Sequence, residues 1–280
     1  MLSTATKVRF ARLIVSGLLS VGVAPVRRIR RRGIRYEVDF REGIDLSLFL
    51  FGTFQRHVLQ TIRCVVPPHG TILDVGANVG AITLPAAAHL VEGRVYAFEP
   101  TDFAWRKLQR NLELNPQLAA RVTPIRSFVA AEETAESSLV AYSSWPVLEN
   151  GAELHPIHKG AAQNASCGQT TIDRFVAEND VASLSLLKID TDGHEMAVLS
   201  GATETLARFR PVVLFEACEY LMKPPRATFD TFEELFRSLG YAIFNGIGGK
   251  PLSAEAFYSR CPRGGGLDLV ALPSETTARA

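Results

Sequence analysis

The 280-residue sequence lacks closely spaced cysteines, long apolar runs and an excess of either charge. Its four cysteines lie far apart without a C-x-x-C pair, which argues against a disulfide framework or a structural zinc site and favours a reducing cytoplasm. No stretch reaches the ~18–20 apolar residues that a membrane-spanning helix needs. Apolar residues make up 47% of the chain and charged residues 21%, so it can bury a core and is not mostly disordered.

The near-neutral net charge of +1 conceals an uneven distribution along the chain. Residues 1–35 contain nine basic residues and no acidic one, which leaves 21 basic against 29 acidic residues, a net charge of −8, in the remainder. An acidic body argues against a nucleic-acid partner, whose phosphates need a broadly basic surface. The sequence therefore predicts a basic arm, residues 1–33, attached to an acidic body.

Apolar residues recur in this arm at helical spacing, at Phe10, Leu13, Ile14, Leu18 and Val21. Three interpretations remain open. In the first, the arm is an amphipathic helix packed on the body, over the substrate entrance. In the second, it makes peripheral contact with a membrane surface through residues 7–35, with its arginines facing anionic lipid. In the third, it is a secretory signal.

The rest of the chain alternates between strand and helix patterns. An appendage, residues 34–70, begins with an alternating strand pattern and ends at Pro67-Pro68, and residues 273–280 form a tail. Between them, residues 71–272 form the main domain, with apolar strand patterns at 71–75, 94–98, 122–129, 184–189, 211–215, 241–244 and 267–272 and helix patterns at 79–90, 103–114, 195–209 and 229–239. This alternation predicts an α/β fold, a mostly parallel sheet with helices on both faces. Ligands of such sheets bind beyond the carboxyl ends of the strands.

The first two strands of this domain end at residues typical of a nucleotide site. The loop after the first strand runs Asp-Val-Gly-Ala-Asn-Val-Gly, with Asp74, Gly76, Asn78 and Gly80, and Glu99 stands 25 positions beyond Asp74 at the tip of the second strand. A carboxylate there can accept both hydroxyls of a ribose. Because an acid at the glycine loop repels a diphosphate and attracts a cation, we predict that these five residues bind S-adenosylmethionine. Ser127 and Phe128, at the end of the third strand, are candidates for contact with its adenine ring.

A second acidic group follows the fourth strand, in Lys188-Ile189-Asp190-Thr191-Asp192-Gly193-His194-Glu195. We expect Asp190 to contact the reactive end of the cofactor. His194 and Glu195 are candidates for the base or for binding the acceptor hydroxyl, since an alcohol needs a positioned base to become a good nucleophile. Glu216, at the tip of the fifth strand, is a further catalytic candidate. Lys188 would be an electrostatic partner of a neighbouring acid.

The same segment supports a different class of enzyme. Asp190-Thr191-Asp192 is a D-x-D sequence, by which metal-dependent glycosyltransferases hold a cation and a sugar nucleotide. The chain shows no separate diphosphate-binding loop, so we expect no bound metal. A module that binds the cofactor without catalysis is a third possibility, which Asp74 and Glu99 disfavour.

Together, the Asp74–Gly80 loop, Phe98-Glu99-Pro100 and Lys188–Glu195 resemble the FkbM family of S-adenosylmethionine-dependent methyltransferases, over about residues 50–272. The resemblance implies a class I Rossmann-like fold, a seven-stranded sheet of order 3-2-1-4-5-7-6 with its last strand antiparallel, and O-methylation of a small molecule or glycan. Two departures concern the substrate side of the site. Asp192 replaces the family's usual Glu, and Phe54-Gln55 replaces an aromatic-Glu pair.

A loop-like segment, residues 150–168, follows Trp145 and contains Glu153, His155 and His158. Its histidines have a metal-like spacing, yet solvated loop histidines are the more common outcome. We expect this insertion to cover the substrate.

Overall fold

The computed structural model describes residues 4–132, 140–142, 146–148, 162–164, 167–219, 228–261 and 265–277. Trp145, Glu153, His155 and His158 lie outside these ranges. Within them, no helix combines the length and the apolar character needed to cross a membrane.

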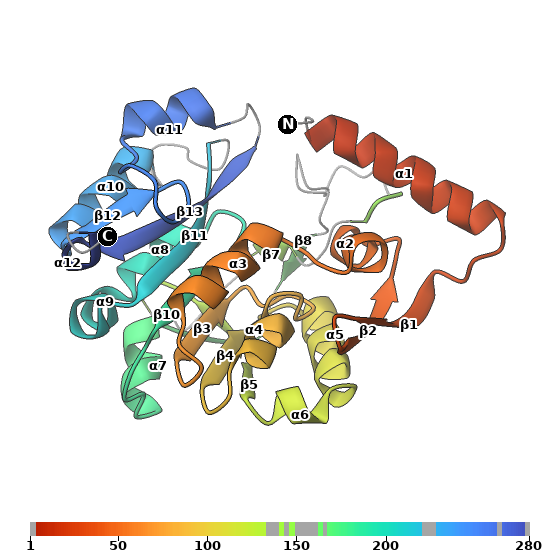
Figure 1. The fold of residues 1–280 in the computed structure, drawn as a ribbon, viewed down its shortest axis with the longest axis horizontal. Coiled ribbons are helices and arrows are strands. Elements are labelled where there is room, and N and C mark those ends of the chain that lie inside the picture. Colours follow the sequence, from red (N-terminus) through yellow and green to blue (C-terminus); the bar gives the residue numbers. More distant parts are fainter. Residues whose placement is uncertain are drawn as a thin grey trace.

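A seven-stranded sheet forms the centre of the molecule (Figure 1). Its strands are β3 (Thr71–Val75), β4 (Arg94–Phe98), β5 (Val122–Ile125), β10 (Leu186–Ile189), β11 (Val212–Cys218), β12 (Tyr241–Phe244) and β13 (Gly266–Pro273), arranged as β5-β4-β3-β10-β11-β13-β12. Counted along the chain, this is the predicted order 3-2-1-4-5-7-6. Strand β13 alone in this sheet is antiparallel to both neighbours, as expected.

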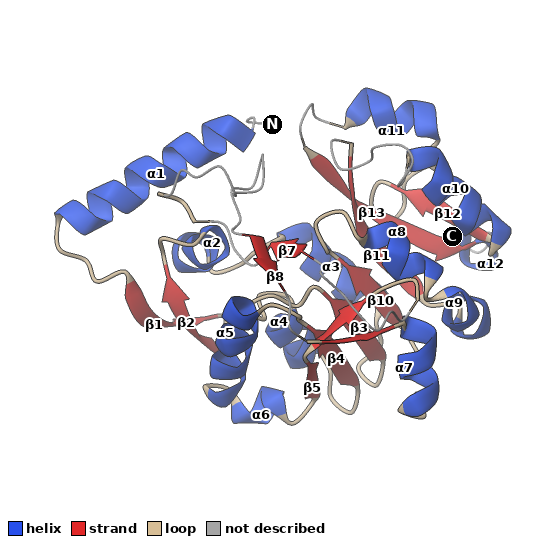
Figure 2. Cartoon of the chain, turned by 180° about the vertical axis from the view of Figure 1, so that it is seen from behind, coloured by secondary structure: helices blue, strands red, loops and turns tan. Residues whose placement is uncertain are grey.

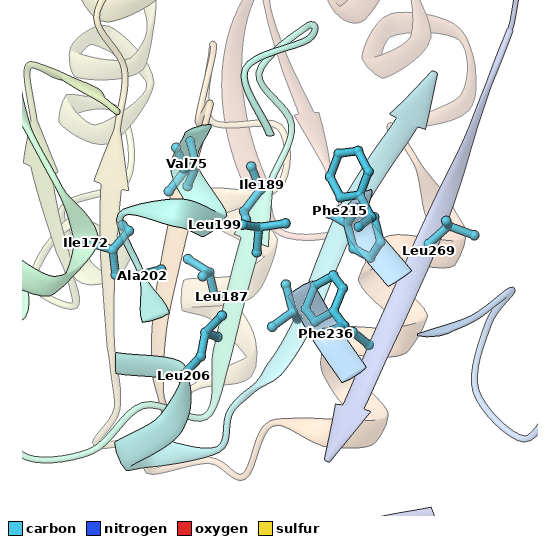
Figure 3. Packing of buried hydrophobic residues seen from close by; sticks show 14 of the residues in the cluster. Val75, Ile172, Leu187, Ile189, Leu199, Ala202, Leu206, Phe215, Phe236 and Leu269 are labelled. Carbon is cyan, nitrogen blue, oxygen red and sulfur yellow. The ribbon is translucent and has the colours of Figure 1, made fainter. Parts of the chain in front are cut away.

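Helices cover both faces of the sheet, which explains why its strands are apolar on both sides (Figure 2). One face packs against α3 (Arg56–Val65), α4 (Thr83–His89) and α5 (Asp102–Glu113), and the other against α7 (Ile172–Glu178), α8 (Glu195–Ser200), α9 (Thr203–Phe209), α10 (Phe229–Ser238) and α11 (Ala254–Arg260). On the second face the ring of Phe215 of β11 stacks on Phe232 of α10, 5.4 Å between ring centroids. It also packs at a tilt against Phe236 of the same helix, 5.2 Å between centroids (Figure 3).

Two predicted elements divide into shorter ones. The strand predicted over 122–129 ends at Ile125, and β6 (Ser127–Val129) leaves the central sheet to pair with β9 (Gly168–Thr170). The helix predicted over 195–209 breaks into α8 and α9 at Gly201, because the chain there approaches the backbone of Ala130 so closely that a Cβ atom would overlap its carbonyl oxygen. The shorter elements outside the central sheet are α6 (Pro116–Ala119), β7 (Val140–Tyr142), β8 (Ala162–Asn164) and α12 (Ser274–Thr277).

The N-terminal elements pack against the side of this domain. Helix α1 (Thr4–Ser20) places Val15 against Phe40, Leu46 and Val147. The arginine-rich segment after it forms a strand, β1 (Val26–Arg31), which pairs antiparallel with β2 (Ile34–Asp39), and α2 (Gly43–Phe51) follows. The sequence pattern did not predict β1, because four of its six residues are arginine and carry no alternating apolar signal.

Two asparagine side chains, Asn111 of α5 and Asn115 just before α6, attach the hairpin to the domain. The Asn111 side-chain oxygen accepts from the backbone N–H of Glu37 (2.8 Å), and its amide nitrogen donates to the carbonyl of Val79 (2.9 Å). One helical turn later, Asn115 accepts from the N–H of Arg35 (2.9 Å) and donates to its carbonyl (2.6 Å). These two buried amides therefore satisfy backbone groups of β2 as a neighbouring strand would.

Replacing Asn111 with alanine should lower the free energy of unfolding by about 1–3 kcal/mol, because two backbone groups lose their partners. Urea denaturation measures this loss. Asn179→Ala is the control, since the side chain of Asn179 donates one hydrogen bond, to the carbonyl of Phe175 in the adjacent helix α7. This bond does not connect two separate elements of the fold. Equal losses for the two variants would contradict the role assigned to Asn111.

Candidate active site

The loop between β3 and α4 lies against the end of β10. The backbone N–H groups of Gly76 and Ala77 both donate to the carbonyl of Phe98, at 3.1 and 2.9 Å. Gly76 has a φ of 79°, and a Cβ atom on it would overlap the carbonyl oxygen of Asp190. Only glycine fits here, and its absent side chain allows the tips of the first and fourth strands to touch.

Glu99, at the tip of β4, is held from two sides. One carboxylate oxygen accepts the backbone N–H of Asn78 (2.9 Å), and the other accepts the N–H (2.9 Å) and hydroxyl (2.5 Å) of Thr101. The residue is only 4% exposed. Burial raises the pKa of Glu99 above its ordinary value, although these hydrogen bonds oppose the shift. The carboxylate is therefore fixed in orientation at the edge of the pocket described below.

Asp74 is buried one layer below that pocket. It accepts a hydrogen bond from the hydroxyl of Thr83 (2.6 Å), and its other oxygen lies 2.9 Å from Nζ of Lys188. The ammonium of Lys188 also donates to the carbonyl of Gly76 (2.9 Å). Burial disfavours a charged lysine, yet attraction to Asp74 and Asp190 outweighs it and raises the pKa of Lys188. The structure thus places Asp74 against Lys188 and not among the residues that line the pocket.

The pocket at the carboxyl ends of β3, β4 and β10 has an acidic lining. Glu99, Asp190 and Asp192 are among its walls, and within the described parts of the chain no lysine, arginine or histidine lines it. Such a lining favours a cofactor that carries a sulfonium and an ammonium, and it repels a diphosphate. The residues present therefore fit S-adenosylmethionine. The other lining residues are Val75, Gly76, Asn78, Phe98, Pro100, Thr101, Ser127, Phe128, Val129 and Thr191.

Most predicted cofactor-binding residues meet at this pocket. Ser127 and Phe128 reach it from β6, where the hydroxyl of Ser127 donates to the carbonyl of Gly168 (3.0 Å). Gly80 does not line it. This glycine lies deeper in the turn, with its N–H donating to the carbonyl of Ala77 (2.9 Å), and it packs against Leu108 of α5.

Two carboxylates of the D-x-D sequence face the pocket. Asp190 accepts a hydrogen bond from the side-chain amide of Gln55 (3.1 Å) and lies 3.9 Å from Nζ of Lys188. Asp192, half-buried in a left-handed conformation (φ 52°), has a pKa raised to about 8 by burial and by the negative charges of Asp190 and Glu195. A carboxylate with a pKa near neutrality is suited to proton transfer. Among the described residues, no group of three or more His, Cys, Asp or Glu side chains is arranged to hold a metal ion.

Glu195 and His194 have other neighbours. The buried carboxylate of Glu195 accepts the N–H groups of Thr191 (2.9 Å) and Gly193 (3.1 Å) and the hydroxyl of Thr191 (3.0 Å). It closes the acidic loop at the start of α8 and lies outside the pocket lining. The ring of His194 packs edge-on against Phe128, 5.1 Å between centroids. Neither residue is among the described residues that line the pocket.

Glu216, on β11, stands beside a pair that the sequence did not reveal. It is opposite Asp268 of β13, and Asp268 accepts from the ring of His57 at 2.5 Å, if Nε2 carries the hydrogen. Burial, Asp190 and Asp268 raise the pKa of Glu216 well above its ordinary value, which favours its protonated form. His57 and Asp268 are 211 positions apart, so only the fold could show that they meet. Gln55 was noticeable in the sequence only as a departure from the family pattern.

A family model described as the methyltransferase FkbM domain matches residues 74–243. The chain therefore belongs to the FkbM methyltransferase family, whose cofactor is S-adenosylmethionine. This confirms the resemblance seen in the motifs and favours methyl transfer over the D-x-D alternative.

Several characterised proteins are similar to the chain. It is 29% identical over 208 residues to the AMB antimetabolite synthetase AmbE of Pseudomonas aeruginosa, covering 64% of this chain and 10% of that protein. It is 26% identical to Methyltransferase 1 of Beauveria bassiana, covering 63% of this chain and 74% of that protein. It is 27% identical to the hexuronic acid methyltransferase AglP of Haloferax volcanii, covering 50% of this chain and 53% of that protein. The chain thus spans only part of these relatives. A crystal structure of an FkbM methyltransferase from Methylobacillus flagellatus is 16% identical, with a TM-score of 0.45 over 73% of this chain and 44% of that one.

The His57–Asp268 pair gives a pH-dependent contribution to stability. Its hydrogen bond raises the pKa of His57, so the contribution is fully present below the unfolded value of about 6.5 and disappears as pH rises through the higher folded value. His57→Gln should therefore cost roughly 0.2–1 kcal/mol at pH 5.5, and less at pH 9, because the imidazole is largely exposed. Denaturant titrations at both pH values measure the difference. A cost independent of pH would show that the pair does not act as an ion pair.

Proposed function

We propose that this domain transfers the methyl group of S-adenosylmethionine to a hydroxyl group of a sugar or another small molecule. The observation that carries the proposal is that Asp192, with its pKa near 8, lines the same pocket as the ribose-binding candidate Glu99. A hydroxyl needs a base as it becomes a nucleophile, and a carboxylate of this pKa supplies one. The similarity to a hexuronic acid methyltransferase supports a sugar as the acceptor.

Each acidic residue of the pocket would bind a different part of the cofactor. Glu99, whose orientation Asn78 and Thr101 fix, would accept the two ribose hydroxyls. Asp190, positioned by Gln55, would face the positively charged end. Ser127 and Phe128 would border the adenine ring. When bound, S-adenosylmethionine supplies a methyl carbon activated by the adjacent sulfonium.

Asp192 would hold the proton in this scheme. As the acceptor oxygen bonds to the methyl carbon and the carbon–sulfur bond breaks, the hydroxyl proton passes to the Asp192 carboxylate. Glu195 would act as a positioning residue, because it fixes the loop that carries Asp192 through Thr191 and Gly193. His194 would support Phe128, and Glu216 would contribute through its charge coupling to Asp190.

Asp192→Asn should lower kcat about 100-fold, because the base is lost. In the unaltered protein kcat/KM should rise with pH through about 8, as Asp192 of the free enzyme loses its proton, and this rise should be absent from the variant. Methyl transfer from labelled S-adenosylmethionine to a panel of sugars, hexuronic acids included, measures both effects.

Glu99→Gln is the matched control for that experiment. It should weaken cofactor binding by about 1–3 kcal/mol in calorimetry and keep the pH dependence. EDTA should change neither affinity nor turnover. An Asp192→Asn variant with full activity would reject Asp192 as the base, and metal-dependent binding of a UDP-sugar would favour the glycosyltransferase alternative.

We also propose that the arm, residues 1–33, brings the domain to an anionic membrane surface. The outward face of α1 exposes Phe10 (55%) and Leu13 (70%), whereas Val15 on the opposite face is buried. Arginines of β1 follow directly. Apolar side chains beside cations are the pattern of an interfacial helix.

Sedimentation with phosphatidylglycerol vesicles tests this contact. The unaltered protein should sediment with these vesicles and not with phosphatidylcholine vesicles, and Leu13→Asp should weaken the association. Val91→Asp is the control, since Val91 is similarly exposed (65%) on the catalytic domain. Equal binding by both variants would rule out α1 as the contact.

A further inference from the structure

A second cavity, of about 390 Å³, lies where the N-terminal hairpin meets helices α2, α3 and α4. The β1–β2 hairpin, the end of α2, and helices α3 and α4 enclose it. It shares no lining residue with the pocket at the strand tips. Nothing in the proposed methyl transfer uses it.

The cavity combines an apolar floor with a basic rim. Buried side chains of Ile34, Tyr36, Leu48 and Leu59 form the floor. Arg31, Arg32, Arg63 and His89 form the rim, and none of the lining residues that the structure describes is Asp or Glu. The three guanidinium groups have no carboxylate among these walls, so a ligand with negative charge would be attracted.

Two of the basic groups are held in place by the backbone. Nη2 of Arg31 donates to the carbonyl of Phe49 at the end of α2 (2.7 Å), and its side chain lies across Gly52, where a Cβ atom would come within 3.0 Å of it. Nε2 of His89 lies 2.7 Å from the carbonyl of Val66. Because a carbonyl only accepts, this nitrogen carries the hydrogen. Preorganised donors lower the entropy cost of binding an anion.

Arg32 occupies a position that arginine rarely takes. With Gly33 it forms the two-residue turn between β1 and β2, and both residues have positive φ, 50° and 86°. Such turns favour Asn, Asp or Gly. A strained residue that carries charge into a cavity indicates a functional constraint.

We propose that this cavity binds a phosphate group carried on an apolar chain. Guanidinium groups pair with phosphate oxygens through two parallel hydrogen bonds, which explains the arginines of the rim. The floor accommodates the first carbons of the chain, which explains why the cavity is not polar throughout. The phosphate comes either from a lipid in a bilayer or from a soluble amphiphile, and the experiment separates the two sources.

The test is calorimetric titration of the full chain with dihexanoyl phosphatidic acid, a water-soluble phosphate with apolar chains. Arg63→Gln and Arg32→Gln should each weaken its binding about tenfold, because each removes a charged hydrogen-bond donor. Arg174→Gln, an exposed substitution on α7 at the other face of the sheet, should leave binding unchanged. Since Arg32 and Arg63 are exposed, thermal unfolding should be the same for all variants.

Inorganic phosphate and vesicles complete the design. Inorganic phosphate should bind at least tenfold more weakly than the amphiphile, since it leaves the floor empty. If phosphatidic acid vesicles capture the protein through Arg32 and Arg63 while the soluble probe does not, the ligand is a bilayer lipid and the proposal stands. Leu13→Asp should not affect binding of the soluble probe, which separates this cavity from the surface of α1.

Binding that is insensitive to Arg32 and Arg63, equal affinity for inorganic phosphate, or no binding of either probe would overturn the proposal. None of these outcomes affects the assignment of the methyl-transfer site.

Discussion

The ion pair between Lys188 and Asp74 is the interaction on which the rest of the site depends. It joins β10 to β3 below the pocket, and the same ammonium binds the carbonyl of Gly76. Two buried charges are tolerated only because each satisfies the other. With Gly76 against the backbone of Asp190, this pair fixes the distance between the glycine loop and the acidic loop. The pocket exists where these two loops meet.

Carboxylates around this centre serve different purposes, set by their surroundings. Glu195 binds backbone N–H groups and shapes the loop, whereas Glu99, Asp190 and Asp192 line the pocket. Mutual repulsion and burial raise the pKa of Asp192 and Glu216. A cationic cofactor would relieve part of this repulsion, so the charge of the site matches its ligand. The same negative charge makes a diphosphate a poor occupant.

The N-terminal part of the chain is basic, whereas the rest is acidic. Arginines of the arm form strand β1 beside the acidic domain, and Asn111 and Asn115 attach its partner strand β2 to the domain. The basic cavity beneath the hairpin lies on the α3–α4 side, away from the acidic pocket. By charge alone, an anionic ligand would therefore favour the basic cavity and a cationic ligand the acidic pocket.

The sequence by itself determined the sheet and the pocket. Apolar strands followed by amphipathic helices lead to one parallel arrangement, and the residues that follow Val75, Phe98 and Ile189 must then meet at one edge. Glu99 and Asp190 could be found this way because a strand tip has a fixed place in such a fold. Only the tertiary structure decided which carboxylates face the pocket, since the direction of a side chain depends on partners distant in the chain. Asp74 binds Lys188 and His57 binds Asp268, and neither pairing has a local pattern, whereas Glu195 binds backbone groups of its own loop.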